Sequence, residues 1–421
     1  TISGGEGDDL IRDSQGANTL DGGLGNDTFD LRGSITPEGS VEGDDGFDTL
    51  KVSSGTDLSG LTLVGVEQLD GSGGYLEYSA GELNAFGFTH LKNVFIKLDG
   101  SLSEGGTLDV SGFSGAINLQ GTNQSDTLIG NDDDNIIRLL SDEKTGNGLG
   151  VDTVNAGGGD DTILWNTRQY EQWSDFFSSA DNATQTYFIE GDVDGGDGTD
   201  ELVLSFGATV PNSPLLSNNY NNSHWYHAWN DNTWNNDGSI DVFSVDLAKL
   251  SLTDVEVVSA TGYDTNRSWA FPAEFIFSNA QLTDLTSLTG FTAISVVGGG
   301  TLDLTHIASL TSATWTIGDA EAYTIVGSSF ADSIELASGA MIVNAGDGDD
   351  VITMRDRTVV TDTLDGGGGN DTLRIYGSAV DLSQANLSGI ENISANSKSL
   401  AWNLEASAIH KFRSEILFKL F

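Results

Sequence analysis

A nine-residue pattern of glycine, aspartate and apolar residues recurs along this chain. It first reads Gly-Gly-Glu-Gly-Asp-Asp-Leu-Ile-Arg over residues 4–12 and continues without a gap over residues 13–21 and 22–30. In all three copies an acid or amide stands at position six and an apolar residue at position eight. One such unit cannot bury its apolar residue alone, so the repeat predicts coils that stack on one another around a continuous core.

Each nonamer divides into a turn and a short extended segment. Six glycine-rich residues turn the chain, and the next three extend with the middle side chain pointing inward. If two nonamers make one coil, residues 18 apart lie above one another, as Asp9 and Asp27 do, and Asp332 and Asp350. An insertion of three residues brings Asp371 onto the same side. We therefore expect an all-β fold of parallel β-roll or β-solenoid segments, interspersed with short helices.

The apolar spacing between the nonamers predicts further short elements. Residues 61–69 and 292–297 alternate or run apolar, which is typical of short strands. Residues 79–86, 279–285 and 405–412 shift towards apolar spacings of three and four, which predicts a helical turn or two in each.

The charge of the chain restricts its partners. It carries 63 acidic and 17 basic residues, a formal net charge of −46, which excludes a nucleic-acid binder because little could neutralise phosphates. No apolar run is long enough to insert into a membrane, and there is no cysteine for disulfides or thiol catalysis. Divalent cations are the obvious counter-charge, and carboxylates with turn carbonyls from adjacent coils form the all-oxygen environment that Ca²⁺ prefers.

We therefore predict calcium as the cofactor, held in the glycine and aspartate turns by the acids of the nonamer frames. The best sites should pair Asp9 with Asp27 and Asp332 with Asp350. The frame of Asp200 looks isolated and should bind more weakly, unless Asp192 or Asp194 supplies its neighbour. The candidate metal ligands are Asp9, Asp27, Asp48, Asp126, Asp152, Asp161, Asp200, Asp332, Asp350, Asp362 and Asp371.

The nonamer resembles the repeat-in-toxin nonapeptide, Gly-Gly-x-Gly-x-Asp-x-apolar-x. The match is strong at residues 4–12, 22–30, 195–203 and 366–374 and degenerate elsewhere. At residues 327–335 the second and fourth positions are Ser and Phe instead of glycine, which weakens the prediction of calcium there. The resemblance implies a calcium-bound parallel β-roll in a type I-secreted bacterial protein, hence a secreted, extracellular or cell-surface location.

A second, longer repeat lies between the nonamer clusters. It is an Asp-Leu…Val-Glu element whose acids are ten residues apart, at Asp57 and Glu67 in the first copy, with copies starting at Asp246 and Asp381. This element resembles sequence found between calcium repeats in very large bacterial surface proteins. The two repeats together indicate the C-terminal part of one module, two full modules, and a segment that either starts a further module or forms a C-terminal end. Their ranges are 1–42, 43–194, 195–365 and 366–421.

Residues 211–237 form an insertion in the second full module, crowded with Asn, Trp and Tyr. It is either a loop that binds a glycan or another partner, or a loop held onto the solenoid by its own aromatic side chains. His224 and His227 lie three apart within it, a weak metal signal without a third ligand. No His-Glu-x-x-His or Gly-x-Ser-x-Gly motif occurs, and the frame carboxylates are better explained by metal binding than by acid–base catalysis.

These features favour a non-enzymatic, calcium-dependent extracellular building block of a surface layer, adhesin or matrix fibre, which folds on binding Ca²⁺. Its expected partners are copies of itself or neighbouring modules, with a cell-surface glycan as a further possibility. The alternative is a calcium-binding accessory region of a secreted polysaccharide-acting enzyme, of the lyase or epimerase kind.

Overall fold

The computed structural model divides the chain into two compact units. One lies within residues 1–170, 190–210 and 251–255, and the other within residues 171–189, 211–250 and 256–421. The residues that the structure describes are 1–76, 83, 85–98, 105–122, 124–141, 151–167, 185–205, 243–261, 274–291, 293–307, 309–310, 314–317, 321–336, 340–355, 360–377, 380–382, 384–397 and 400–401.

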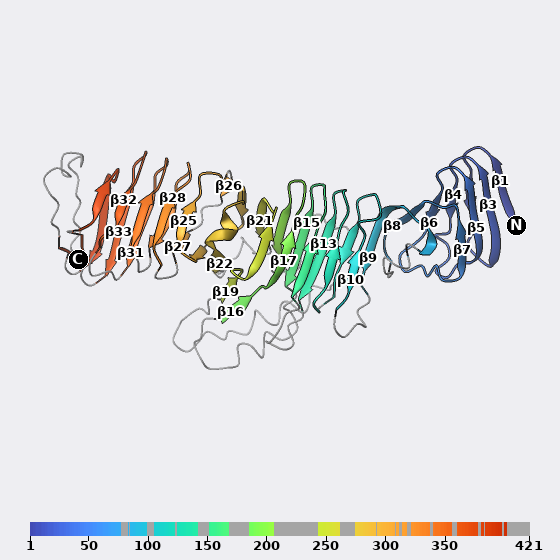
Figure 1. Cartoon of the computed structure of the whole chain (residues 1–421), viewed down its shortest axis with the longest axis horizontal. Coiled ribbons are helices and arrows are strands. Elements are labelled where there is room, and N and C mark those ends of the chain that lie inside the picture. The colour runs from blue at the N-terminus through green and yellow to red at the C-terminus, as the bar shows by residue number, and fades with distance from the viewer. Residues whose placement is uncertain are drawn as a thin grey trace, which may run out of the picture. The chain divides into compact units, whose positions relative to one another are not determined.

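In the first unit, parallel strands face each other across the coil (Figure 1). One face holds, in spatial order, β2 (Leu10–Arg12), β4 (Thr28–Asp30), β6 (Thr49–Lys51), β8 (Gln68–Leu76), β9 (His90–Lys97), β11 (Asn118–Gln120), β13 (Ile136–Ser141), β15 (Thr162–Thr167) and β18 (Glu201–Ser205). The other face holds a sheet of β1 (Ile2–Glu6), β3 (Ala17–Leu24), β5 (Glu38–Asp45) and β7 (Leu61–Val64). It also holds a second sheet of β10 (Thr107–Asp109), β12 (Thr127–Ile129), β14 (Asp152–Asn155), β17 (Gly191–Asp194) and β20 (Leu250–Thr253).

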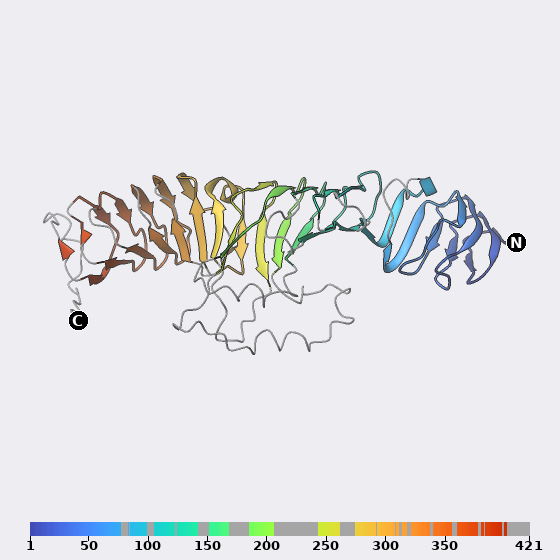
Figure 2. The same cartoon turned by 90° about the horizontal axis from the view of Figure 1, so that it is seen from below.

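The second unit repeats this arrangement (Figure 2). Its longest face holds β16 (Gln185–Phe188), β19 (Phe243–Asp246), β22 (Glu274–Ser278), β24 (Ala293–Val297), β27 (Thr314–Ile317), β29 (Ser333–Leu336), β31 (Val351–Arg355), β33 (Thr372–Gly377) and β36 (Asn392–Ser397). A second sheet holds β25 (Gly300–Asp303), β28 (Tyr323–Val326), β30 (Met341–Asn344), β32 (Thr363–Asp365) and β35 (Asn386–Ser388). Further parallel pairs join β21 (Val257–Thr261), β23 (Ser287–Thr289) and β26 (Ser309–Leu310), and β34 (Val380–Asp381) with β37 (Leu400–Ala401).

The strand register confirms that two nonamers make one coil. Leu10 lies beside Thr28, 18 residues on, whereas Thr28 lies beside Thr49, 21 residues on. The second unit shows the same steps, because Ser333 pairs with Val351 and Val351 with Thr372. The expected insertion of three residues before Asp371 is therefore accommodated in the turn without disturbing the ladder of strands.

Position eight of the nonamer supplies the core. Ile11, Leu20 and Phe29 are 5%, 2% and 0% exposed. Phe29 lies beside Leu50 in the next coil, and Leu50 beside Leu69 in the one after it. Because the same inward position recurs in every coil, each new coil extends one column of apolar side chains, and the burial of these side chains drives the stacking.

Several local predictions have an outcome in the described residues. The apolar segment 61–69 forms two strands, β7 and β8, separated by a turn at Gly65, whose φ is 64°. β24 confirms the strand expected near residues 292–297, and the helical turn expected after residue 279 is the 3₁₀ helix η1 (Asn279–Leu282). Within the described residues, no helix is long and apolar enough to cross a membrane.

Other predictions fall partly or wholly outside the described residues. They are the helical turn at 405–412, the aromatic insertion 211–237 with His224 and His227, and most of the turn at 79–86. The division of the chain into modules at residues 42, 194 and 365 remains a prediction from the repeats.

Candidate metal centre

The acids at position six of the nonamers form a ladder along the coil axis. Asp9, Asp27 and Asp48 each stand directly before a strand of the same sheet: β2, β4 and β6. The backbone N–H of Asp9 donates to Oδ1 of Asp27 over 2.7 Å, and the N–H of Asp27 donates to Oδ1 of Asp48 over 2.7 Å. The structure therefore brings together the predicted pair Asp9 and Asp27, and adds Asp48 to it.

The second unit contains an equivalent ladder. The N–H of Asp332 donates to Oδ1 of Asp350 over 2.7 Å, and the N–H of Asp350 donates to Oδ1 of Asp371 over 2.8 Å. These are the residues whose spacing predicts a stack, including the offset of Asp371. The same geometry in two separate units shows that the ladder follows from the nonamer itself.

The prediction for Asp200 needs correction. Asp200 is not isolated, and its neighbour in the stack is neither Asp192 nor Asp194. The N–H of Asp161 donates to Oδ1 of Asp200 over 2.8 Å, across 39 residues of sequence. One step earlier, the N–H of Asn135 donates to Oδ1 of Asp161 over 2.6 Å, so these three residues form a third ladder.

In most rungs of the ladders, one carboxylate oxygen accepts a hydrogen bond from a backbone N–H, and the other oxygen has no protein partner. Among the described residues, the buried carboxylate oxygens without a hydrogen-bond partner include Oδ2 of Asp9, Asp27, Asp48, Asp161, Asp350 and Asp371, and Oδ1 of Asp332. An ionised carboxylate that is buried with one oxygen unsatisfied is costly, unless a cation or a proton compensates it. The ladder thus fits a bound cation.

In the frames of Asp9 and Asp27, a glycine at position one leaves the space into which the unpartnered oxygen points. A Cβ on Gly22 would lie 2.2 Å from Oδ2 of Asp27 and 2.9 Å from the carbonyl oxygen of Gly43. A Cβ on Gly4 would lie 2.7 Å from both Oδ2 of Asp9 and the carbonyl oxygen of Gly22. Carboxylate and carbonyl oxygens of successive coils therefore converge where only glycine fits, and this all-oxygen donor set suits Ca²⁺.

Burial changes the acidity of the ladder. It raises the pKa of Asp161 and of Asp350 to about 7, and neighbouring carboxylates add to this effect. Burial also raises the pKa of Asp48, Asp332 and Asp371 above the ordinary value. At neutral pH the carboxyls of Asp161 and Asp350 therefore hold a proton part of the time unless a cation replaces it, so calcium binding there releases protons.

The frame of Asp126 is closed by its own residues. Its Oδ1 accepts a hydrogen bond from the N–H of Gly106 over 2.9 Å, and its Oδ2 accepts one from the hydroxyl of Thr122 over 2.9 Å. Thr122 occupies position two of the nonamer. Most of the open frames, meaning those whose carboxylate keeps an oxygen without a protein partner, carry glycine there, and the frame of Asp48 carries Asp44. Both carboxylate oxygens are therefore satisfied without a metal, in contrast to the predicted role of Asp126 as a ligand.

Two other degenerate frames also contain a hydrogen bond between the side chains at positions two and six. The amide of Asn135 donates to Oδ1 of Asn131 over 2.7 Å, and the hydroxyl of Ser328 donates to Oδ2 of Asp332 over 3.0 Å. In each frame the side chain at position two binds the side chain at position six. Polar side chains at position two thus replace part of what a cation supplies in the glycine-containing frames.

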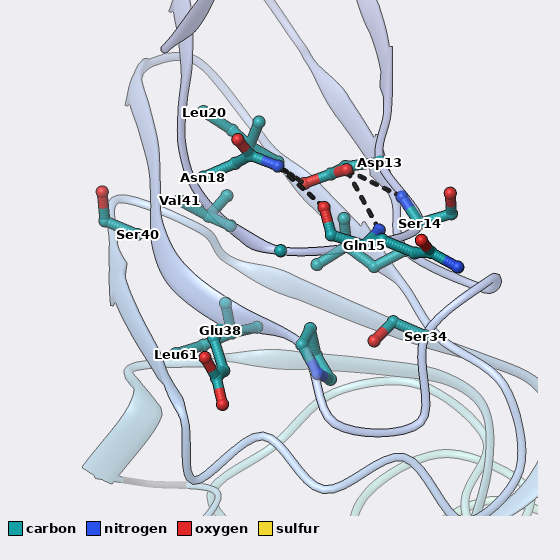
Figure 3. Close-up of a pocket in the computed structure, with 13 residues that line it drawn as sticks. Asp13, Ser14, Gln15, Asn18, Leu20, Ser34, Glu38, Ser40, Val41 and Leu61 are labelled. Atoms are coloured by element: carbon teal, nitrogen blue, oxygen red, sulfur yellow. Dashed lines mark hydrogen bonds between the residues drawn. The ribbon is translucent and has the colours of Figure 1, made fainter.

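The frame at residues 13–21 is also held by its own side chains (Figure 3). Asp13 replaces the first glycine, and its carboxylate accepts hydrogen bonds from the N–H of Ser14 over 2.8 Å and from the amide of Asn18 over 2.8 Å. The adjoining cavity has a volume of about 10 Å³. This is barely enough for one water molecule, so the cavity offers no room for a larger ligand.

Asp152 is the first residue of β14, and Asp362 stands directly before β32, on the opposite faces of the two coils. The N–H of Asp126 donates to Oδ1 of Asp152 over 2.9 Å, and burial raises the pKa of Asp152 to about 7. The N–H donor to Oδ1 of Asp362, over 3.0 Å, comes from Met341, which is not an acid. These faces therefore carry shorter acid stacks than the faces of Asp27 and Asp350.

No group of three His, Cys, Asp or Glu side chains gathers around one point among the described residues. Each coil contributes one position-six carboxylate to a given ladder, so an ion bound there would take its remaining oxygens from the backbone carbonyls of the turns. Such a site is not a cluster of acidic side chains, and the periodicity of the sequence identifies it.

Comparison with protein families is decisive for the repeat. A family model described as the RTX calcium-binding nonapeptide repeat (4 copies) matches residues 1–31, 112–142, 148–164, 324–353 and 361–374. The chain contains RTX calcium-binding nonapeptide repeats. RTX nonapeptide repeats are calcium-binding motifs that occur in secreted proteins, so calcium is its metal. No curated protein matches the chain.

The ladders of this chain extend beyond the matched residues. Asp48 and Asp200 lie outside the matched ranges, yet each accepts a hydrogen bond from a matched frame acid. The ladders of Asp9 to Asp48 and of Asp332 to Asp371 also end on glutamates that are not among the predicted ligands. The N–H of Asp48 donates to Oε2 of Glu67 over 2.9 Å, and the N–H of Asp371 donates to Oε2 of Glu391 over 2.8 Å. In the sequence these glutamates are visible only as landmarks of the second repeat.

Replacing an open-frame aspartate and a closed-frame aspartate should have different effects. We expect Asp350→Asn to reduce the number of bound calcium ions, because Oδ2 of Asp350 has no protein partner and loses its charge. Asp126→Asn should leave that number unchanged and cost about 1–3 kcal/mol, because one donor to its buried carboxylate loses its acceptor. Calorimetric calcium titration of both variants checks this, and an equal loss of ions in both would show that the hydroxyl of Thr122 does not close its frame.

Proposed function

We propose that this chain is a calcium-dependent structural module of an extracellular assembly, such as a surface layer, an adhesin or a matrix fibre, and that it is not a catalyst. The observation that carries this proposal is the ladder of frame carboxylates in both units, in which each carboxylate binds the backbone of the preceding coil. The frame carboxylates of the ladders thus stabilise the stacking of the chain's own coils.

A second cavity of the first unit supports the same proposal. It has a volume of about 660 Å³ and is lined by Arg12, Asp30 and Arg32, among others. Asp30 pairs with Arg32 at 2.8 Å and with Arg12 at 3.3 Å. The hydrogen bonds from Arg32 hold the pKa of Asp30 well below its usual range, so this carboxyl stays ionised and is a poor general acid.

Association follows from the edges and the charge of the solenoid. β1 is an edge strand, and all five of its residues are exposed, so its backbone can pair with a strand from a neighbouring module or another copy. A net charge of −46 repels other copies at low calcium. Calcium that neutralises or bridges the acidic faces removes this barrier and makes assembly depend on the ion.

Light scattering and electron microscopy test this proposal at rising protein concentration, with millimolar calcium, with millimolar magnesium, and with a chelator. We expect oligomers, filaments or sheets with calcium only. A chain that stays monomeric at high concentration in calcium would contradict the proposed association. Turnover of an acidic polysaccharide by the purified chain would favour the accessory region of an enzyme instead.

A further inference from the structure

We propose that Glu67 and Glu391 are calcium ligands, each of which completes a site with the last aspartate of a ladder. This proposal rests on calcium binding at the ladders and adds sites outside the nonamers. Neither glutamate belongs to a nonamer frame, and neither lies within the residues that match the RTX repeat. Both come from the Asp-Leu…Val-Glu element.

The glutamates occupy the same place in the coil as the frame aspartates. Glu67 stands directly before β8, as Asp48 stands before β6, and the residues that follow them, Gln68 and Thr49, are register partners. Glu391 stands before β36 in the same relation to Asp371 and β33. Each glutamate accepts the N–H of the last aspartate, as every aspartate in the ladder does for the one before it.

A buried, unsatisfied oxygen lies at each of these ends. Asp48 is 0% exposed and Asp371 is 1% exposed, and Oδ2 of both has no hydrogen-bond partner. Without a further acid, the next coil would supply no carboxylate to an ion bound at the last aspartate of each ladder. The glutamate supplies this second charge at the point where the series of aspartates stops.

The carbonyl groups at these ends also repeat those of the nonamers. A Cβ on Gly43 would lie 1.9 Å from the carbonyl oxygen of Gly65 and 2.4 Å from Oδ2 of Asp48. A Cβ on Gly366 would lie 2.0 Å from the carbonyl oxygen of Gly389, and Oδ2 of Asp371 would be 2.8 Å away. The oxygen pair that marks the open frames is thus rebuilt where a nonamer meets the element.

A tight left-handed turn explains why the acid is glutamate. Gly65 has a φ of 64° and Gly389 a φ of 60°, and each is followed by one apolar residue and then the glutamate. The glycine precedes the acid by two residues here, whereas in the nonamers position one precedes position six by five residues, as Gly43 precedes Asp48. The shorter turn starts the side chain from a different point, and the extra methylene of glutamate restores its reach to the aspartate above.

The test uses the full-length chain with Glu67→Gln, Glu391→Gln and the double variant. Glutamine keeps an oxygen that can accept the aspartate N–H but removes the charge, so it separates metal binding from hydrogen bonding. Glu321→Gln is the matched control, because Glu321 is exposed and lies outside the ladders. Calcium is the probe, titrated by calorimetry, and circular dichroism at saturating calcium verifies that each variant folds.

We expect each single variant to bind one calcium ion fewer than the parent chain, or to bind its weakest ion at least tenfold more weakly, and the double variant to add both losses. Unchanged stoichiometry and affinity in the double variant would overturn the role of the glutamates. In that case Asp27→Asn and Asp350→Asn, measured in parallel, decide whether the ladders still bind calcium. A variant that does not fold even at saturating calcium is replaced by Glu67→Asp or Glu391→Asp, which should lose the same ion because aspartate is too short.

Discussion

Removing calcium should abolish most of the β structure of the chain. Without the ion, each ladder keeps buried carboxylate oxygens that have no partner, and the whole chain carries a net charge of −46. The buried apolar column opposes this destabilisation, but the glycine-rich turns also lose much conformational entropy on folding. We expect the far-ultraviolet circular dichroism of the calcium-free chain to resemble that of an unfolded chain, and the β signal to return on adding millimolar calcium.

Magnesium is the control for this experiment. Mg²⁺ demands a near-octahedral shell and usually keeps several waters, whereas these turns offer carbonyl and carboxylate oxygens from the protein. Magnesium should therefore fail to restore the β signal at the same concentration. A β spectrum that survives thorough calcium removal would mean that the apolar column of Phe29, Leu50 and Leu69 is enough to hold the coils together.

Acidification should partly replace calcium. Asp161, Asp350 and Asp152 have pKa values raised by burial to about 7, compared with an ordinary value near 3.9 in an unfolded chain. Between these values the metal-free folded state binds more protons than the unfolded state, so its stability increases as the pH falls from about 7 to about 4. We expect the calcium-free chain to gain β structure when the pH is lowered from 8 to 5.

The calcium-loaded chain should respond in the opposite sense, because protons compete with calcium for the same carboxylates and weaken its binding over this pH range. The variant Asp161→Asn/Asp350→Asn is a control, because its amides do not titrate, and its metal-free form should gain less structure on acidification. A further loss of β signal in the calcium-free parent chain between pH 8 and 5 would contradict the assignment of protons to the buried ladder.

The coil and its core could be predicted from the sequence because a nonamer repeat has a fixed register. The 18-residue spacing of Asp9 and Asp27, and the apolar residue at position eight, follow directly from that register. The partnership of Asp161 with Asp200 could not be predicted, since 39 residues separate them and no nonamer count spans that interval. The stacking of Glu67 on Asp48 could not be predicted either, because the 19 residues that separate them are not a whole number of nonamers.

The distinction between open and closed frames depends on side-chain geometry. The sequence shows that Thr122 and Ser328 replace glycine, and therefore that the pattern is degenerate there. It does not show that their hydroxyl groups reach the carboxylates of Asp126 and Asp332. Both oxygens of Asp126 are satisfied in this way, together with the N–H of Gly106, whereas Oδ1 of Asp332 has no partner among the described residues. The contribution of the side chain at position two thus comes from the structure.

A crystal structure of the calcium-loaded chain is the most direct test of the ladder as the metal site. We expect ions coordinated by oxygen at roughly 2.3–2.6 Å from Oδ2 of Asp27 and of Asp350, together with carbonyl oxygens of the glycine turns. The frame of Asp126 should contain no ion, because Thr122 already binds its carboxylate. A calcium-loaded structure in which Oδ2 of both Asp27 and Asp350 has no ion within coordinating distance would contradict this account.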